Sequence, residues 1–291
     1  MNVILPNKPI KIIPISEFER IICTRQSIDI WSADGIKTKN LLVNLEHIID
    51  IVLTQGTTIA ISGIEGGKRR LIWLNFKTNK ILMTDDSFSK PVNSLIYNEQ
   101  NKWLIAFAFD NTIHVFNASD FSLLKCIQTD FCLSYPIMVN PLNTIVGLDY
   151  FTHEYRGINM IDFTENLLPK EIKNIAAYNE KYNYVISIDG KSLCAIDLKH
   201  QNLIHSITFE SVIQHVEVSP DSQTLFISLI YNDVFFFDAE HFKLISQFKH
   251  GNNPINTDYQ DLFWPMTFNA HSKSVIIGCH SCEVYEKLIH E

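Results

Sequence analysis

A short segment of alternating apolar and polar residues recurs seven times along the 291 residues. Each instance ends in a large apolar residue that is followed by a small polar or acidic one. With that polar residue as a marker, the successive spacings are 43, 42, 45, 35, 41 and 48 residues. A period of about 40 residues with several short strands per unit is typical of a β-propeller. The markers are Ser32, Asn75, Asn117, Asp162, Asp197, Asp238 and Glu286.

Three further apolar segments accompany a typical marker, two before it and one after it. In the unit of Asp238 they cover residues 216–218, residues 225–229 and the stretch that begins at Leu244. Polar turns separate the segments and no unit carries a helical period, so each unit is expected to form four strands, a to d. We therefore predict an all-β chain that folds as a single seven-bladed β-propeller in one domain, 1–291. The expected blades are roughly 8–45, 46–86, 90–130, 132–172, 173–209, 211–250, and 262–291 together with 1–7.

The two ends of the chain predict how the ring closes. Only residues 287–291 follow the marker Glu286, too few for a full strand d, whereas residues 2–5 form a spare strand before the first blade. Because unpaired sheet edges promote aggregation, we expect the N-terminal strand to close the last blade. Deletion of residues 1–6 is expected to lower the melting temperature sharply.

Two stretches resemble a known repeat family. Residues 216–226, with Ser219, Pro220 and Asp221 at the turn, look like strand a, the turn and strand b of a WD repeat. Residues 107–117 are similar to that family's b–c hairpin, with Phe116-Asn117 where Trp-Asp is usual. The Gly-His pair that the family carries before strand a is nearly missing. The chain thus resembles the WD-repeat proteins, which implies the same propeller fold.

Composition limits the class of partner and the compartment. Hydrophobic residues make up 46% and charged residues 19% of the chain, as in a globular protein. The formal net charge of −8 disfavours nucleic acid, because phosphates would be repelled, and a basic protein is easier to accommodate. No apolar stretch is long enough for a membrane helix, no secretory signal is present, and six cysteines are too few for a disulfide scaffold. We expect a cytoplasmic monomer that binds no membrane.

Linear motifs offer little chemistry. The pair Cys279 and Cys282 lacks the second pair of ligands that structural zinc needs, so we interpret residues 279–282 as a b–c turn. Asp85 and Asp86 end a strand d, where solvated charge is the ordinary explanation, and no nucleophile, phosphate-loop or dinucleotide motif occurs. We expect no catalytic residue, no cofactor and no metal, hence no enzyme. A site assembled around the central channel from several blades would not show as a linear motif.

A partner is expected on one rim of the propeller. In a four-stranded meander the b–c and d–a connections share a rim, and the two long ones, at 149–156 and 250–264, both belong to it. Aromatic residues and arginine dominate binding hot spots, and we expect exposure of Tyr150, Phe151 and Tyr155, whereas Phe263 and Trp264 could instead begin a core strand. The residues proposed for protein binding are Lys68, Arg69, Arg70, Phe131, Tyr150, Phe151, His153, Tyr155, Arg156, Tyr259, Phe263 and Trp264.

These observations favour a non-enzymatic protein–protein interaction module. It would act as a scaffold or adaptor, or as a stoichiometric inhibitor of a partner protein. One alternative is an immunity-type protein that neutralises a toxin, since an acidic surface suits a basic active cleft. Another is a propeller hydrolase or lactonase-like enzyme, which predicts carboxylates and histidines converging in the central channel.

Overall fold

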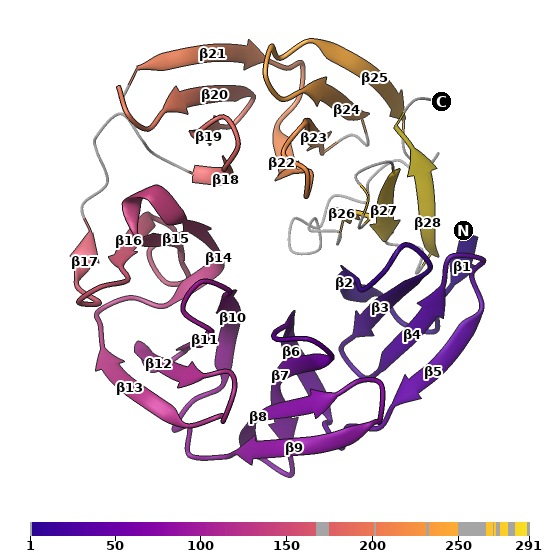
Figure 1. Cartoon of the computed structure of the whole chain (residues 1–291), viewed down its shortest axis with the longest axis vertical. Helices are drawn as coiled ribbons and strands as arrows, with labels where there is room; N and C mark the ends of the chain where they lie inside the picture. Colours follow the sequence, from indigo (N-terminus) through magenta and orange to yellow (C-terminus); the bar gives the residue numbers. More distant parts are fainter. Residues whose placement is uncertain are drawn as a thin grey trace.

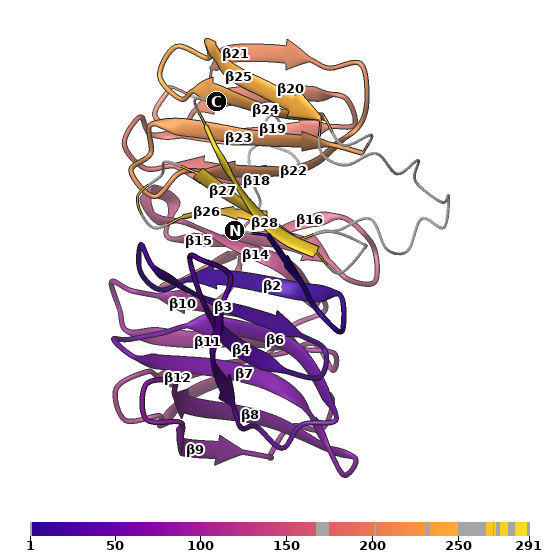
Figure 2. The same cartoon turned by 90° about the vertical axis from the view of Figure 1, so that its right-hand side faces the viewer.

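The chain folds into a ring of seven four-stranded antiparallel sheets around a central axis (Figure 1). The structure, a computed structural model, describes residues 2–166, 175–200, 202–230, 233–249, 266–269, 271, 274–278 and 283–289. Seen from the side, the ring is a thick disc (Figure 2). The predicted all-β, seven-bladed propeller is confirmed.

Each blade is a meander whose strands a, b, c and d follow one another in the chain, except that β1 supplies strand d of the last blade. The first three blades contain β2 (Pro9–Pro14), β3 (Glu19–Thr24), β4 (Ile28–Ser32), β5 (Lys37–Leu41), β6 (His47–Leu53), β7 (Thr58–Glu65), β8 (Lys68–Asn75), β9 (Lys80–Asp85), β10 (Val92–Asn98), β11 (Trp103–Ala108), β12 (Thr112–Asn117) and β13 (Leu123–Gln128). The last four contain β14 (Leu133–Val139), β15 (Thr144–Asp149), β16 (Tyr155–Asn159), β17 (Glu165–Asn166), β18 (Ile175–Asn179), β19 (Tyr184–Asp189), β20 (Ser192–Asp197), β21 (Leu203–Thr208), β22 (Ile213–Val218), β23 (Thr224–Leu229), β24 (Asp233–Asp238), β25 (Leu244–Lys249), β26 (Met266–Phe268), β27 (Ser274–Gly278), β28 (Glu283–Leu288) and β1 (Asn2–Ile4).

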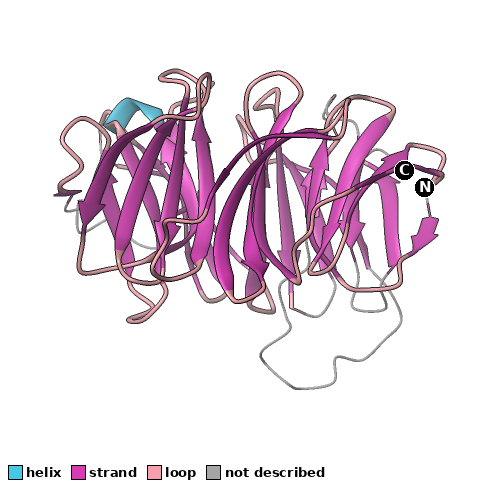
Figure 3. Cartoon of the chain, turned by 90° about the horizontal axis from the view of Figure 1, so that it is seen from below, coloured by secondary structure: helices cyan, strands magenta, loops and turns pink. Residues whose placement is uncertain are grey.

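Strand a of each blade lies nearest the axis and strand d lies on the outside (Figure 1). Because neighbouring strands run antiparallel, the a–b and c–d turns fall on one rim and the b–c and d–a connections on the other. The 3-10 helix η1 (Asn140–Leu142) is the a–b turn of blade four and marks the first rim in Figure 3. We call the second one the b–c/d–a rim.

The blades pack face to face through strands b and c, whose side chains are apolar on both faces. In β11, for example, every residue after Trp103 is buried. Trp73 of blade two meets Phe116 of blade three edge to face, with ring centroids 5.1 Å apart. Such contacts between neighbouring sheets remove apolar surface from water and stabilise the ring.

The ring closes as predicted. Val3 of β1 pairs with Val284 of β28, so the N-terminal strand completes the last blade. Between blades seven and one, Arg20 is 2% exposed and its guanidinium lies 2.9 Å from the Glu286 carboxylate. A buried arginine needs such a partner, and this ion pair joins the two blades that meet at the closure.

The repeated polar marker ends strand c because its side chain caps the c–d turn. The Asn75 side-chain oxygen accepts the Thr78 amide at 2.9 Å, and Asp197 accepts the His200 amide at 2.7 Å. These are Asx-type turns, in which a side chain replaces a backbone acceptor.

Two of the seven predicted markers are wrong. In blade four strand c ends at Asn159, whose side chain accepts the Ile161 amide at 2.7 Å, and Asp162 belongs to the turn. In blade seven strand c continues past Glu286 to Leu288. The apolar run of blade four extends into its turn, which masked the true end of the strand in the sequence.

Candidate functional site

The b–c loop of blade four, residues 150–154, is organised by a buried carboxylate. Asp149 accepts the Thr152 hydroxyl at 2.6 Å, the Cys132 amide at 3.2 Å and the Phe151 amide at 3.3 Å. Burial alone would raise the pKa of Asp149, but these hydrogen bonds outweigh it and lower the pKa below its usual value. The charged carboxylate thus fixes the loop that carries Tyr150, Phe151 and His153, and the His153 amide donates to the Asp149 carbonyl.

Three exposed aromatic side chains and the half-buried Phe109 form a cluster at this loop. Tyr150 is 48% and Phe151 is 55% exposed, which confirms the exposure expected for both. Tyr150 contacts Phe109, from the b–c turn of blade three, with centroids 4.7 Å apart, and Phe151 at 5.4 Å. Tyr135, from strand a of blade four, is 67% exposed. We call Phe109, Tyr135, Tyr150 and Phe151 the aromatic patch.

Tyr135 owes its position to an irregularity in strand a. Tyr135 and Pro136 both lie between the paired residues Ser134 and Ile137, opposite Gly147 alone. A Cβ atom at Gly147 would lie 3.0 Å from the Ser134 carbonyl oxygen, so the glycine makes room for this bulge. Tyr135 has φ +51°, a left-handed backbone that costs free energy in a tyrosine. The bulge therefore holds an exposed ring in a strained conformation.

The hydroxyl of Tyr135 lies within electrostatic range of Asp50. The pKa of Tyr135 is raised, first because protein atoms surround the hydroxyl and then by the charges of Asp50 and Tyr150. Water still reaches most of the ring. Asp50 belongs to strand a of blade two and Tyr135 to strand a of blade four, and both strands lie on the axial side of their blades (Figure 1).

Of the proposed contact residues, Phe131 is inaccessible and Tyr155 is only partly accessible, and their assignment to a binding surface is corrected. Phe131 is only 2% exposed and packs in the core between blades three and four, because the d–a link passes between the two sheets. Tyr155 is half-buried and packs against a core cluster that includes Val139 and Val146. Burial raises the pKa of Tyr155. Its expected exposure is wrong, because Tyr155 is already the first residue of β16.

Beside the aromatic patch lies a surface rich in carboxylates. Arg156 donates to Glu165 at 2.8 Å and to Glu154 at 3.1 Å, and its own side chain is 29% exposed. Asp130, in the d–a link, is exposed. The pKa of Arg156 is raised, first by the hydrogen bond to Glu165 and to a smaller extent by the charges of Glu154 and Asp130. We call Asp130, Glu154 and Glu165 the acidic margin. Three carboxylates around one guanidinium leave this surface negative.

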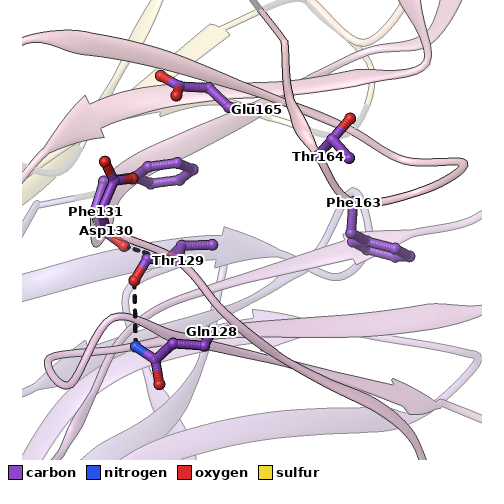
Figure 4. Close-up of a pocket in the computed structure, with 7 residues that line it drawn as sticks. All are labelled: Gln128, Thr129, Asp130, Phe131, Phe163, Thr164 and Glu165. Carbon is purple, nitrogen blue, oxygen red and sulfur yellow. Dashed lines mark hydrogen bonds between the residues drawn. The ribbon is translucent and has the colours of Figure 1, made fainter.

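A cavity of about 380 Å³ opens between blades three and four (Figure 4). The Tyr150 amide donates to the Cys132 carbonyl at 2.8 Å, so the d–a link that lines the cavity also borders the aromatic patch. The lining residues are Gln128, Thr129, Asp130, Phe131, Phe163, Thr164 and Glu165.

The basic residues of blade two lie on the same rim but belong to a separate feature. Lys68, Arg69 and Arg70 begin β8 after a tight turn in which Gly66 and Gly67 both have positive φ. The Lys68 ammonium lies 3.4 Å from the Asp86 carboxylate, and Arg70 pairs with Glu65. Glu65 belongs to blade two and Asp86 directly follows its last strand, so the ion pairs of this hairpin stay within that blade.

Several sequence-based assignments cannot be placed. Tyr259, Phe263 and Trp264 lie outside the described residues, as does the segment from Cys279 to Cys282. Conversely, sequence reasoning did not propose Phe109 as a binding residue. An aromatic residue inside a strand or turn is ordinarily core.

The carboxylates of strands a are engaged with neighbouring blades. Asp50 accepts the Lys11 ammonium of blade one at 2.7 Å and the Leu95 amide of blade three at 2.8 Å. Glu217 of blade six accepts the Thr267 hydroxyl of blade seven at 2.9 Å. Over the described ranges, no group of three or more His, Cys, Asp or Glu residues is arranged to hold a metal ion.

No known protein-family model matches this chain, and no curated protein sequence matches it either. Among the residues that the structure describes, no helix has the length and apolar character needed to cross a membrane. The site therefore has to be interpreted from its own geometry.

Proposed function

We propose that this chain is a non-enzymatic protein-binding module that acts through the aromatic patch. The observation that supports this most directly is the aromatic patch, in which Tyr135, Tyr150 and Phe151 are exposed and Phe109 from a third segment supports Tyr150. Burial of an aromatic side chain contributes roughly 1.5–3 kcal/mol. Three segments that jointly keep such rings in water indicate a surface that a partner covers.

The residue types suit protein recognition. Tyrosine has an apolar ring with a polar tip and few rotatable bonds, so ordering it on binding costs little entropy. The Asp149 hydrogen bonds and the Gly147 bulge hold the rings in place before the partner arrives, which reduces the cost further. Binding would make this module an adaptor between proteins or a stoichiometric inhibitor of its partner, a toxin included.

The channel favours binding over hydrolysis. A hydrolytic site would need carboxylates or histidines that are free to take up protons from substrate. Asp50 and Glu217 instead accept hydrogen bonds from adjacent blades. These contacts support a structural role for the two carboxylates and give no support to the enzyme alternative.

We also propose that the chain is related to the WD-repeat proteins and that it acts in the cytoplasm. In blade six, the Ser219 hydroxyl oxygen accepts the Thr224 amide at 2.8 Å and donates to Asp221 at 2.6 Å. The Ser-Pro-Asp turn is thus a fixed a–b turn of the kind that the resemblance implies.

The direct test compares two exposed aromatic sites on opposite rims. The Tyr150→Ala/Phe151→Ala double variant should lose the partner that wild type captures from its native lysate, with an unchanged melting temperature. Phe18→Ala is the matched control, because Phe18 is 67% exposed in the a–b turn of blade one, on the other rim. Partner capture that survives the double variant, or is lost equally with Phe18→Ala, would overturn the proposal.

A further inference from the structure

The cavity between blades three and four combines two kinds of wall. The largely buried rings of Phe131 and Phe163 lie at its base, and Asp130 and Glu165 contribute carboxylates at its edge (Figure 4). A ligand that matches both walls has an apolar stem and a cationic end. Lysine and arginine side chains have this construction.

The surrounding charges also select a cation. The acidic margin and Asp162 together supply four carboxylates near the cavity, and Arg156 and Lys125 supply two cations. Arg156 is held between Glu154 and Glu165, so it does not balance Asp130. The excess negative charge raises the local concentration of cationic groups and would speed their association.

The aromatic wall already attracts a cation from the chain itself. The Lys125 ammonium lies 4.9 Å from the centroid of the Phe163 ring, the geometry of a cation–π contact. One of the two rings that line the cavity therefore already contacts a positive charge.

Size and position distinguish a side chain from a free ion. A cavity of about 380 Å³ is much larger than a metal ion or an ammonium ion needs. It shares the d–a link with the aromatic patch, since the Tyr150 amide donates to the Cys132 carbonyl. A single polypeptide segment could therefore cover the patch with an apolar residue and extend a basic side chain into the cavity.

We propose that the cavity receives a lysine or arginine side chain of the partner protein, adjacent to an apolar residue that covers the aromatic patch. This inference rests on the proposed function and specifies the partner's chemistry. The partner presents a basic, partly apolar segment, and Asp130 and Glu165 determine its preference for positive charge.

The test selects ligands from a random twelve-residue peptide library displayed on phage, with the full chain as bait. Selected peptides should be enriched in lysine or arginine beside an apolar residue. Their affinity, measured by fluorescence anisotropy with synthetic peptides, should fall about tenfold for Asp130→Asn, as expected for loss of one charge-assisted contact. Raising the ionic strength from about 0.1 M to about 0.5 M should weaken binding as well.

Controls separate this inference from the proposed function. Glu99→Gln removes one carboxylate from the a–b turn of blade three, on the opposite rim, and should leave the affinity unchanged. Peptides that depend on Tyr150 but show no basic enrichment and tolerate Asp130→Asn would overturn the inference and leave the proposed function intact. Selected peptides that bind Tyr150→Ala as well as wild type, or no selected peptides at all, would count against both.

Discussion

Blades three and four are neighbours with opposite characters. In blade three, strand a has a single extra residue, Asn93, and strand d runs from Leu123 to Gln128. In blade four, strand a has the wider Tyr135–Pro136 bulge, and the described part of strand d is only Glu165–Asn166. Blade three buries Phe107 and Phe116, whereas blade four exposes Tyr135, Tyr150 and Phe151. The comparison shows that departures from the repeat, more than the repeat itself, generate the candidate site.

The same contrast appears in how the turns are held. On the a–b/c–d rim, single marker side chains such as Asn117 cap short turns, as when it accepts the Ser119 amide at 2.9 Å. On the b–c/d–a rim of blade four, Asp149 organises a loop of the same length, 150–154 against 118–122, through three acceptor contacts. These contacts help to offset the backbone entropy that is lost when the loop is ordered.

The largest expected effect lies in the regular blade. Phe116 is almost fully buried against Trp73, so Phe116→Ala should lower the free energy of unfolding by about 3–5 kcal/mol through lost burial and a residual cavity. Urea denaturation followed by tryptophan fluorescence measures the loss. Phe151→Ala, the matched exposed aromatic of blade four, should change stability by less than about 0.5 kcal/mol. Equal losses for the two variants would remove the distinction between the blades.

A smaller effect is expected inside the irregular blade. Tyr155 is half-buried against Val139 and Val146, so Tyr155→Ala should cost about 2 kcal/mol in the same denaturation experiment. Tyr155→Phe keeps the ring and serves as the control. If Tyr155→Ala proved as stable as wild type yet lost its partner, Tyr155 would have to be returned to the binding surface.

The b–c loop of blade four should depend on pH through Asp149. Its pKa is lowered in the folded chain, so its contribution is complete above the unfolded value near 3.8 and is lost as the pH falls through the lower folded value. Asp149→Asn should cost about 1–2 kcal/mol at neutral pH and should flatten the acid limb of the stability curve below about pH 4. Unfolding titrations of both proteins between neutral and acidic pH provide the measurement. An acid limb of unchanged steepness in Asp149→Asn would contradict this role.

The smallest expected effect is a gain in stability. Asparagine adopts the left-handed backbone more readily than tyrosine, so Tyr135→Asn should stabilise the fold by about 0.5–1 kcal/mol while weakening partner binding. Tyr135→Ala removes the ring but keeps an unfavourable backbone, and it should weaken binding without the gain. Thermal unfolding together with the capture assay separates the two contributions. If Tyr135→Asn were destabilised, the tyrosine ring would be contributing packing rather than strain.

Periodicity made the frame predictable. The marker residues recur because each c–d turn needs a side-chain acceptor at its first position, a local requirement that a sequence displays directly. Two markers were misplaced, and both errors fall in the least regular blades, four and seven. In blade four the apolar run continues beyond the strand, and in blade seven the strand continues beyond the marker, so pattern and strand end do not coincide.

Accessibility was less predictable than the frame. Tyr150 and Phe151 follow a strand end and were correctly expected to be exposed, whereas Phe131 has the same residue type and is buried and Tyr155 is half-buried. The difference depends on whether the neighbouring blade covers the position. The neighbouring blade is a separate sheet, and the local sequence pattern does not specify where that sheet packs.

The sequence by itself determined the all-β class, the number of blades and the closing role of the N-terminal strand, because short-range alternation and a fixed period encode them. Only the tertiary structure decided that Tyr135 is exposed in a bulge opposite Gly147 and that Phe109 meets Tyr150. The same holds for the cavity beside Asp130 and Glu165. These features arise where two blades meet, and contacts between residues far apart in the chain depend on how whole sheets pack.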